Sequence, residues 1–406
     1  MATGRTARLA AVLLAGWLVL AGTASALPAD APLDLRLGKA LHQKGVAAGK
    51  TGAIAIELGA GAVVYAQNAA KPLQPASTEK LAVAVAALDE LGPGYTIETL
   101  VLGRGEQDGG AWRGDLVLKG FGDPSLHADD LALLAAQVRD HGIRKVTGRI
   151  LGDESYFDAR RTAPGWKPSF YKNECPPLSA LVVDRAWLDG GTADEPALAA
   201  AIAFRRALVK AGVKVAGKAG RGDAGDAASE LARVGSPPLS RLVMWMNAES
   251  DNFVAEMLLK VLGAEEAGRG TTAAGAGVVR RELAERGVPL VGVRIVDGSG
   301  LSRSDRLTAQ ALAALLVSGR EDARISHAFV GSLAVAGVSG TLEDRMETGP
   351  ARGTVRAKTG TTDAASALAG YAGRSYVFVV VMNGSPVSYW AAQRAQDRFA
   401  ELLAAQ

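Results

Sequence analysis

The sequence has little of what metal sites and disulfides require. Among its 406 residues there is one cysteine, Cys175, and there are four histidines, none of them in an HExxH pattern. A single cysteine cannot form an internal disulfide, and isolated histidines do not match the ligand spacing of a zinc site. We therefore expect a fold that is stabilised by packing, and a chemistry that uses no metal and no cofactor.

A strong excess of charge of one sign is also missing. The chain carries 45 lysines and arginines against 42 aspartates and glutamates, a formal net charge of +3. Nucleic-acid binding needs a basic surface, so this balance does not favour a nucleic-acid partner. Apolar residues make up 48% of the chain, which is enough for a globular core.

Long hydrophobic runs are confined to the N-terminus. Arg5 and Arg8 precede the apolar residues 9–21, and residues 24–26 (ASA) then form the small-x-small pattern that a signal peptidase cleaves. The run is short for a bilayer span, so residues 1–26 are predicted to be a cleaved signal peptide, with an uncleaved anchor as the alternative. No later apolar run is long enough to span a membrane. We expect an exported protein, in a periplasm rather than outside a single-membrane envelope.

Strand patterns lie at both ends of the chain, and helical patterns lie between them. Two strands are expected near the N-terminus, joined by the turn Gly59-Ala60-Gly61, and three near the C-terminus. We expect them to form one sheet built from both termini. The expected strands are residues 52–58, 62–67, 354–358, 366–373 and 376–382. The expected helices are residues 33–47, 77–91, 239–247, 253–262, 272–286, 308–317 and 387–405.

The pattern changes between residues 95 and 237. Short strand-like pieces alternate there with turns and with one expected helix at 129–141, and the glycine-rich residues 217–228 have the composition of an exposed loop. The change predicts one or more inserted, strand-rich domains at 95–237. Residues 27–94 and 238–406 would then form a single α/β domain.

The helix expected at residues 77–91 begins with a candidate nucleophile and base. Serine is a weak nucleophile until a base takes its proton. Ser77 and Lys80 are one helical turn apart on the same face, so the amine can reach the hydroxyl. A lysine acts as a base only when burial or a neighbouring cation lowers its pKa. The spacing therefore predicts Ser77 as nucleophile and Lys80 as base.

Two later patterns supply the remaining groups. In Ser250-Asp251-Asn252, Ser250 is expected to relay a proton to a leaving amine, and Asn252 to hold a substrate amide.

The other pattern, Lys358-Thr359-Gly360, lies on an expected strand. Lys358 is expected to be the cation beside the base and to attract a substrate carboxylate. Gly360 allows a peptide backbone to approach closely. The amide of Thr361, with the first-turn amide of Ser77, would form an oxyanion hole.

Each pattern alone is weak evidence, because S-x-x-K and K-T-G both occur twice. Residues 169–172 (SFYK) lie in a proline-bounded aromatic segment without helical periodicity, and residues 50–52 (KTG) precede every possible nucleophile. Position therefore excludes both copies. The lysine-threonine-glycine at 50–52 is expected only to enter the first strand.

Three segments resemble the active-site motifs of a known family. PASTEKL (75–81), SDNFVAEMLL (250–259) and AKTGT (357–361) are similar to the motifs of the class C low-molecular-mass penicillin-binding proteins, the type-4 group. The resemblance continues through LVLKGFGDPSL (116–126) and VDGSGLSRSDRLT (296–308), and it covers most of the chain after residue 26.

The resemblance implies a D-alanyl-D-alanine carboxypeptidase or endopeptidase. Its fold would be a transpeptidase/β-lactamase-like domain, an antiparallel sheet with helices, interrupted by inserted domains between the first two motifs. Peptidoglycan stem peptides would be its substrates and β-lactams its inhibitors, while the oligomeric state stays open. The implied roles are Ser77 as nucleophile, Lys80 as base, Ser250 and Asn252 as proton relay and substrate contact, and Lys358, Thr359 and Thr361 as carboxylate and oxyanion ligands, beside Gly360.

Two alternatives stay open at this point. A serine β-lactamase shares the first and third motif types, but the sequence has no E-x-x-L-N-like segment that would activate water, and the long insertion does not favour a compact lactamase. A non-catalytic peptidoglycan-binding relative is disfavoured because all the motif residues are present. Gly298-Ser299-Gly300 fails the G-x-S-x-G pattern of a nucleophile elbow, so we expect a structural turn near the rim of the site.

Overall fold

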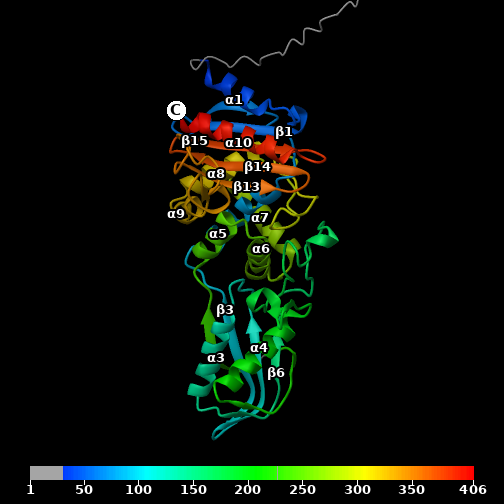
Figure 1. The fold of residues 1–406 in the computed structure, drawn as a ribbon. Coiled ribbons are helices and arrows are strands. Elements are labelled where there is room, and N and C mark those ends of the chain that lie inside the picture. Colours follow the sequence, from blue (N-terminus) through cyan, green and yellow to red (C-terminus); the bar gives the residue numbers. More distant parts are fainter. Residues whose placement is uncertain (1–30, 226) are drawn as a thin grey trace, which may run out of the picture.

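The computed structural model describes residues 31–225 and 227–406, so the signal peptide expected at residues 1–26 lies outside the described residues. The main body holds one antiparallel sheet built from both ends of the chain, which confirms the prediction (Figure 1). The strand nearest the N-terminus pairs with the last strand, with Thr51 opposite Met382. The strand order is β12 (Ala334–Val335), β13 (Val355–Thr361), β14 (Ala365–Ala372), β15 (Tyr376–Asn383), β1 (Thr51–Glu57) and β2 (Ala62–Gln67).

Helices cover both faces of this sheet. The central strand β15 has the sequence YVFVVVMN and is buried along most of its length, because neither of its faces meets water. On one face lie α1 (Leu33–Leu41) and α10 (Tyr389–Ala404) (Figure 1). Phe399 of α10 packs there against Phe378 of β15 and Tyr65 of β2.

The helices on the other face surround α2 (Lys80–Glu90). Every residue of α2 from Lys80 to Leu88 is buried, so the helix has no polar face. Its surroundings include α5 (Leu239–Ala248), α6 (Asn252–Ala267), α7 (Thr272–Glu285), α8 (Ala309–Glu321) and α9 (Ser326–Gly331).

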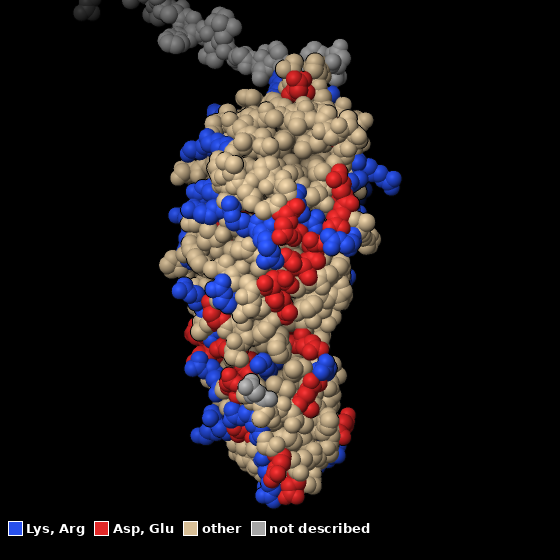
Figure 2. Space-filling view, turned by 180° about the vertical axis from the view of Figure 1, so that it is seen from behind, with Lys and Arg blue, Asp and Glu red and all other residues tan. Residues whose placement is uncertain are grey.

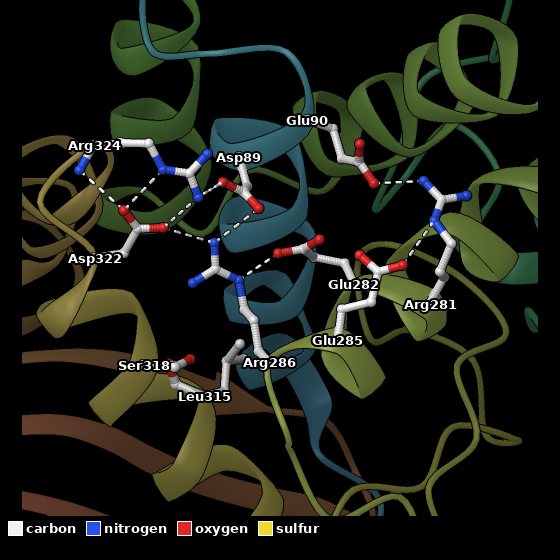
Figure 3. Close-up of polar contacts among 10 residues, drawn as sticks. All are labelled: Asp89, Glu90, Arg281, Glu282, Glu285, Arg286, Leu315, Ser318, Asp322 and Arg324. Carbon is white, nitrogen blue, oxygen red and sulfur yellow. Dashed lines mark hydrogen bonds and ion pairs between the residues drawn. The ribbon is translucent and has the colours of Figure 1, made fainter.

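An ion network joins the ends of α2, α7 and α8 (Figure 3). Arg286, directly after α7, places Nη2 3.0 Å from Oδ2 of Asp89 and 3.0 Å from Oδ2 of Asp322. Its Nε also contacts Glu282, and Arg324 adds contacts to both aspartates. The Arg286 side chain is only 10% exposed, so the network links three helices at a nearly buried point.

A second sheet lies at the end of the elongated molecule opposite α1 and α10 (Figure 1). Its core is separate from that of the main body and includes Leu118, Val138 and Phe204. Two helices, α3 (Ala128–Asp140) and α4 (Pro196–Lys210), pack on this sheet. The strand order is β10 (Ala219–Arg221), β6 (Ile150–Asp153), β4 (Ala111–Gly120), β3 (Glu98–Asp108) and β11 (Ser229–Gly235), with β5 (Lys145–Val146) and β9 (Lys214–Val215) beside this path.

The chain between β6 and α4 returns to the main body. Phe157, Cys175, Leu178 and Val182 are buried in the same core cluster as residues of α2 and α6. This return segment, residues 154–186, brings parts of the middle region next to the motif residues. After it, β7 (Trp187–Leu188) and β8 (Gly191–Thr192) form a short hairpin.

Several elements differ from the sequence interpretation. The helix α4 was not expected, although Pro196 at its first position and a run of alanines are helix signals. Residues 217–228 were expected to be a loop, but they contain β10, which pairs in parallel with β6 and is too short to show alternation. The helix expected at residues 33–47 ends at Leu41, and η1 (Ala48–Lys50) follows as a short 3₁₀ turn.

The surface agrees with the nearly balanced composition. Figure 2 shows basic and acidic side chains along the whole length of one face. Among the helices of residues 31–225 and 227–406, none combines the length and the hydropathy of a membrane span.

Candidate active site

Ser77 lies in a tight turn that leads into α2. The turn is a short 3₁₀ helix, η2 (Ala76–Glu79), and Lys80 continues it as the first residue of α2. Ala76 has a φ of +47°, a left-handed value that is unusual for alanine, and the Thr78 hydroxyl donates to the carbonyl of Pro75 at 2.7 Å. Strained backbone of this kind persists where surrounding contacts hold it, which is common at functional sites.

Lys80 joins the first two motifs. Its Nζ donates to Oγ of Ser77 at 2.9 Å, to Oδ1 of Asn252 at 2.8 Å and to the carbonyl of Ser299 at 2.7 Å. The three bonds use all three hydrogens of an ammonium group. The side chain is fully buried, and this burial lowers the pKa of Lys80 to about 8, against the opposing charges of Asp297 and Glu256.

The second motif lies between α5 and α6. Ser250 has a φ of +60° and Asp251 caps α6 by accepting from the amide of Val254 at 3.0 Å. Asn252, the first residue of α6, donates through Nδ2 to the carbonyl of Glu174 at 3.0 Å. Both ends of its amide therefore have partners, Lys80 on one side and the return segment on the other.

The third motif lies on β13, next to the serine turn. A Cβ added to Gly360 would stand 2.9 Å from the carbonyl oxygen of Pro75 and 3.2 Å from the amide nitrogen of Ser77, so the strand passes close to the nucleophile turn. The Thr359 hydroxyl donates to Thr341 at 2.9 Å, and Thr361 ends the strand with its side chain exposed.

Lys358 is as deeply buried as Lys80. Burial first, and then the charge of Lys80, lower the pKa of Lys358 well below its usual range. Its Nζ donates to the carbonyl of Thr359 at 2.9 Å. Burial, one of the two causes expected to lower the pKa of Lys80, is the main cause of that shift.

The second copies of the motifs lie elsewhere. In the S-x-x-K copy, Nζ of Lys172 pairs with Oδ1 of Asp194 at 2.6 Å and donates to the carbonyl of Thr192, while Ser169 lies in the 3₁₀ turn η3 (Pro168–Phe170). In the K-T-G copy, Thr51 is the first residue of β1, as expected.

Three groups at the site were not expected from the sequence. The carbonyls of Ser299 and Glu174 accept from Lys80 and Asn252, and backbone contacts of this kind leave no side-chain signal. Glu256 is fully buried and accepts from the amide of Ser299 at 2.8 Å. Its signal is position, because it follows Asn252 by one helical turn on the same face of α6. The turn expected at the rim is thus fully buried against Lys80.

The structure combines an α/β body, interrupted by a second sheet, with a buried lysine that contacts a serine hydroxyl, which is the pairing that a serine hydrolase requires. In residues 31–225 and 227–406, no group of three or more histidine, cysteine, aspartate or glutamate side chains is arranged to hold a metal ion. The chain belongs to the D-Ala-D-Ala carboxypeptidase 3 (S13) family, whose model matches residues 33–194 and 190–406.

Relatives in sequence support this membership, and a solved structure shares the fold. The D-alanyl-D-alanine carboxypeptidase of Actinomadura sp. (strain R39) is 32% identical, over 79% of this chain and 74% of that protein. Carboxypeptidase DacB of Mycolicibacterium smegmatis is 32% identical, over 80% of this chain and 74% of that one. Penicillin-binding protein 4 of Haemophilus influenzae shares the fold, with a TM-score of 0.80 at 23% identity over 91% of this chain and 99% of that one.

Proposed function

We propose that the chain is an exported serine D-alanyl-D-alanine peptidase that acts on peptidoglycan stem peptides through an acyl-enzyme on Ser77, in a periplasm. The observation that carries the proposal is the 2.9 Å contact between Oγ of Ser77 and Nζ of Lys80, in a buried position beside β13. A lysine with a pKa of about 8 exists partly as the free amine at neutral pH, which is the form that a general base requires.

The reaction has two steps. Oγ of Ser77 attacks the carbonyl carbon of the penultimate D-alanine, and Nζ of Lys80 takes the hydroxyl proton. The C–N bond breaks, and the leaving amine takes a proton, for which Ser250 is the relay. Water then attacks the ester carbonyl carbon and passes a proton to Nζ of Lys80. The bond between that carbon and Oγ of Ser77 breaks, Oγ takes the proton from Lys80, and the shortened peptide leaves as its carboxylic acid.

The third motif binds the substrate in this proposal. Lys358 and Thr359 hold the terminal carboxylate, and Asn252 contacts a substrate amide after exchanging one of its present partners. The amides of Ser77 and Thr361 stabilise the oxyanion. The closeness of Gly360 to the serine turn supports this arrangement, because a side chain there would fill the space beside Ser77.

Labelling with a fluorescent penicillin tests the nucleophile. The wild-type protein and a Ser169→Ala variant, which removes the serine of the second S-x-x-K, should both be labelled, whereas Ser77→Ala should not. All three should show the same far-ultraviolet circular dichroism. Labelling of folded Ser77→Ala, or no labelling of the folded wild type, would contradict the proposal.

Product analysis decides which bond is cut. Incubation with a pentapeptide stem and with a cross-linked dimer, followed by mass spectrometry, distinguishes loss of one D-alanine from cleavage of the cross-link. A β-lactam adduct that persists for many minutes supports a peptidase, because a β-lactamase would release it rapidly.

A further inference from the structure

Four carboxyl groups are fully buried around Lys80. They are Glu79, Glu256, Asp297 and Asp305, on the serine turn, on α6 and in the loop before α8. Several ionised carboxylates cannot share a space without water when one lysine is their main counter-charge. Their hydrogen bonds therefore indicate which of them carries the negative charge.

Asp297 has the contacts of an anion. It accepts from the amides of Gly300 at 2.8 Å and Ser302 at 2.7 Å, and from Nε1 of Trp166 at 2.8 Å. Such donors stabilise an ionised carboxylate. The indole donor comes from the return segment, so the middle region contributes directly to the surroundings of the base.

The other carboxyls are poorly provided with donors. Neither side-chain oxygen of Glu79 has a hydrogen-bond partner, one oxygen of Glu256 also lacks one, and the Asp305 carboxyl is hydrogen-bonded to that of Asp297. Burial and the charge of Asp297 raise the pKa of Asp305 to about 12 and that of Glu256 to about 8. Burial and the neighbouring charges thus disfavour the ionised forms of these three groups, whereas the hydrogen-bond donors gather around Asp297.

Glu256 reaches Lys80 through a single peptide unit. Its Oε1 accepts from the amides of Gly298 at 3.0 Å and Ser299 at 2.8 Å, and the carbonyl of Ser299 accepts from Nζ of Lys80 at 2.7 Å. The same helix contributes Asn252, which binds Nζ directly. Helix α6 thus fixes the amine from two directions.

We propose that Glu256 and Asp297 are positioning residues for Lys80, with Glu256 holding the Ser299 carbonyl against the amine and Asp297 acting as its buried counter-charge. The inference rests on the proposed function, in which Lys80 is the base. Neither carboxylate contacts the Ser77 hydroxyl; both act through Lys80 and through the turn at residues 297–302.

Asp297 and Glu256 should affect the pH profile of the acylation rate differently. Acylation needs the free amine of Lys80, so its rate should fall about tenfold for each pH unit below the pKa of about 8. Asp297→Asn removes a negative charge that favours the ammonium, so the pKa of Lys80 should fall and the acid limb should move to lower pH by about one unit. The other groups facing Lys80 stay in place: Glu79, Cys175, Asp251, Glu256, Lys358 and Asp305.

Three variants, Asp297→Asn, Glu256→Gln and Glu256→Met, test the proposal by the second-order rate of acylation with a fluorescent penicillin from pH 5 to 9. Glu256→Gln keeps the acceptor for the two turn amides and should stay within about threefold of wild type at pH 7. Glu256→Met has similar length but no acceptor, and it should lose at least about tenfold.

Two comparisons distinguish a positioning role from a general loss of structure: the position of the acid limb in Asp297→Asn, and the acylation rates of Glu256→Gln and Glu256→Met. A merely structural defect would lower the rate at every pH without moving the limb, and Gln would not restore it. A folded Asp297→Asn with an unmoved limb, or a folded Glu256→Met at the wild-type rate, would overturn the inference. Should one of these variants not fold, the other still decides. Absence of labelling in the wild type would instead reject the proposed function itself.

Discussion

Gly300 shows at the residue scale how tightly the turn at residues 297–302 packs against the nucleophile. Its φ is +79°, and an added Cβ would stand 2.0 Å from the carbonyl oxygen of Ala76, directly before Ser77. A methyl group there must displace the serine turn. We expect Gly300→Ala to lower the acylation rate at least about tenfold and to destabilise the fold by about 2–4 kcal/mol.

Gly349 is the matched control for this substitution. Its φ is +78°, almost the same as that of Gly300, but nothing lies within 4 Å of an added Cβ. Gly349→Ala should therefore cost only the backbone strain, about 1–2 kcal/mol, and keep the acylation rate. Equal acylation rates for the two variants, measured with folded protein, would show that the contact with the serine turn does not matter.

At the element scale, the nearly buried Arg286 stabilises the end of α2, the helix that carries Lys80. Arg286 joins the ends of α2, α7 and α8, whereas Arg281 on α7 contacts Glu90 and Glu285 with a side chain that is 42% exposed (Figure 3). Removing the Arg286 cation leaves Asp89, Glu282 and Asp322 close together and largely shielded from water. We expect Arg286→Met to lower the free energy of unfolding by about 3 kcal/mol, and Arg281→Met by less than about 1 kcal/mol.

Urea denaturation of both variants measures this difference. Both substitutions remove one positive charge and keep a long side chain, so a general effect of net charge would appear equally in the two. An Arg286→Met variant as stable as Arg281→Met would show that the network adds nothing beyond ordinary surface ion pairs.

Elements with a strong periodic pattern could be predicted from the sequence, and elements defined by distant contacts could not. The strands β1, β14 and β15 lie within a residue or so of the expected ranges, because each is bounded by turns and rich in apolar residues. The strand β10 was not predicted because it is defined by its pairing with β6 and not by a sequence pattern of its own. The helix α4 had signals of its own, Pro196 and a run of alanines, that the sequence interpretation did not use.

The same distinction holds for the site. Contact between Ser77 and Lys80 follows from helical spacing, so the sequence predicts it. The carbonyls of Glu174 and Ser299 come from a return segment and a turn that only the folded chain brings there. The burial that lowers the pKa of Lys80 is likewise a property of the packed helices around α2.

On the scale of the whole molecule, the core of the second sheet is separate from the core around the helix that carries Lys80. The core of the second sheet contains none of the motif residues, whereas the core around α2 includes residues of α6, α8 and the return segment. The site should therefore tolerate damage to the second sheet, provided that the return segment stays in place. Two fully buried phenylalanines allow this to be tested with one kind of substitution: Phe204 on α4 and Phe329 on α9.

Phe204→Ala and Phe329→Ala should each cost about 3–5 kcal/mol in the core where they lie. Phe204→Ala should nevertheless acylate at close to the wild-type rate at a temperature where circular dichroism shows it folded, because its cavity lies among α4 and the second sheet. Phe329→Ala should lose both stability and acylation, since the ring belongs to the core that surrounds the helix of Lys80. Equal losses of acylation in the two folded variants would mean that the sheets act as one unit and that the site depends on both cores.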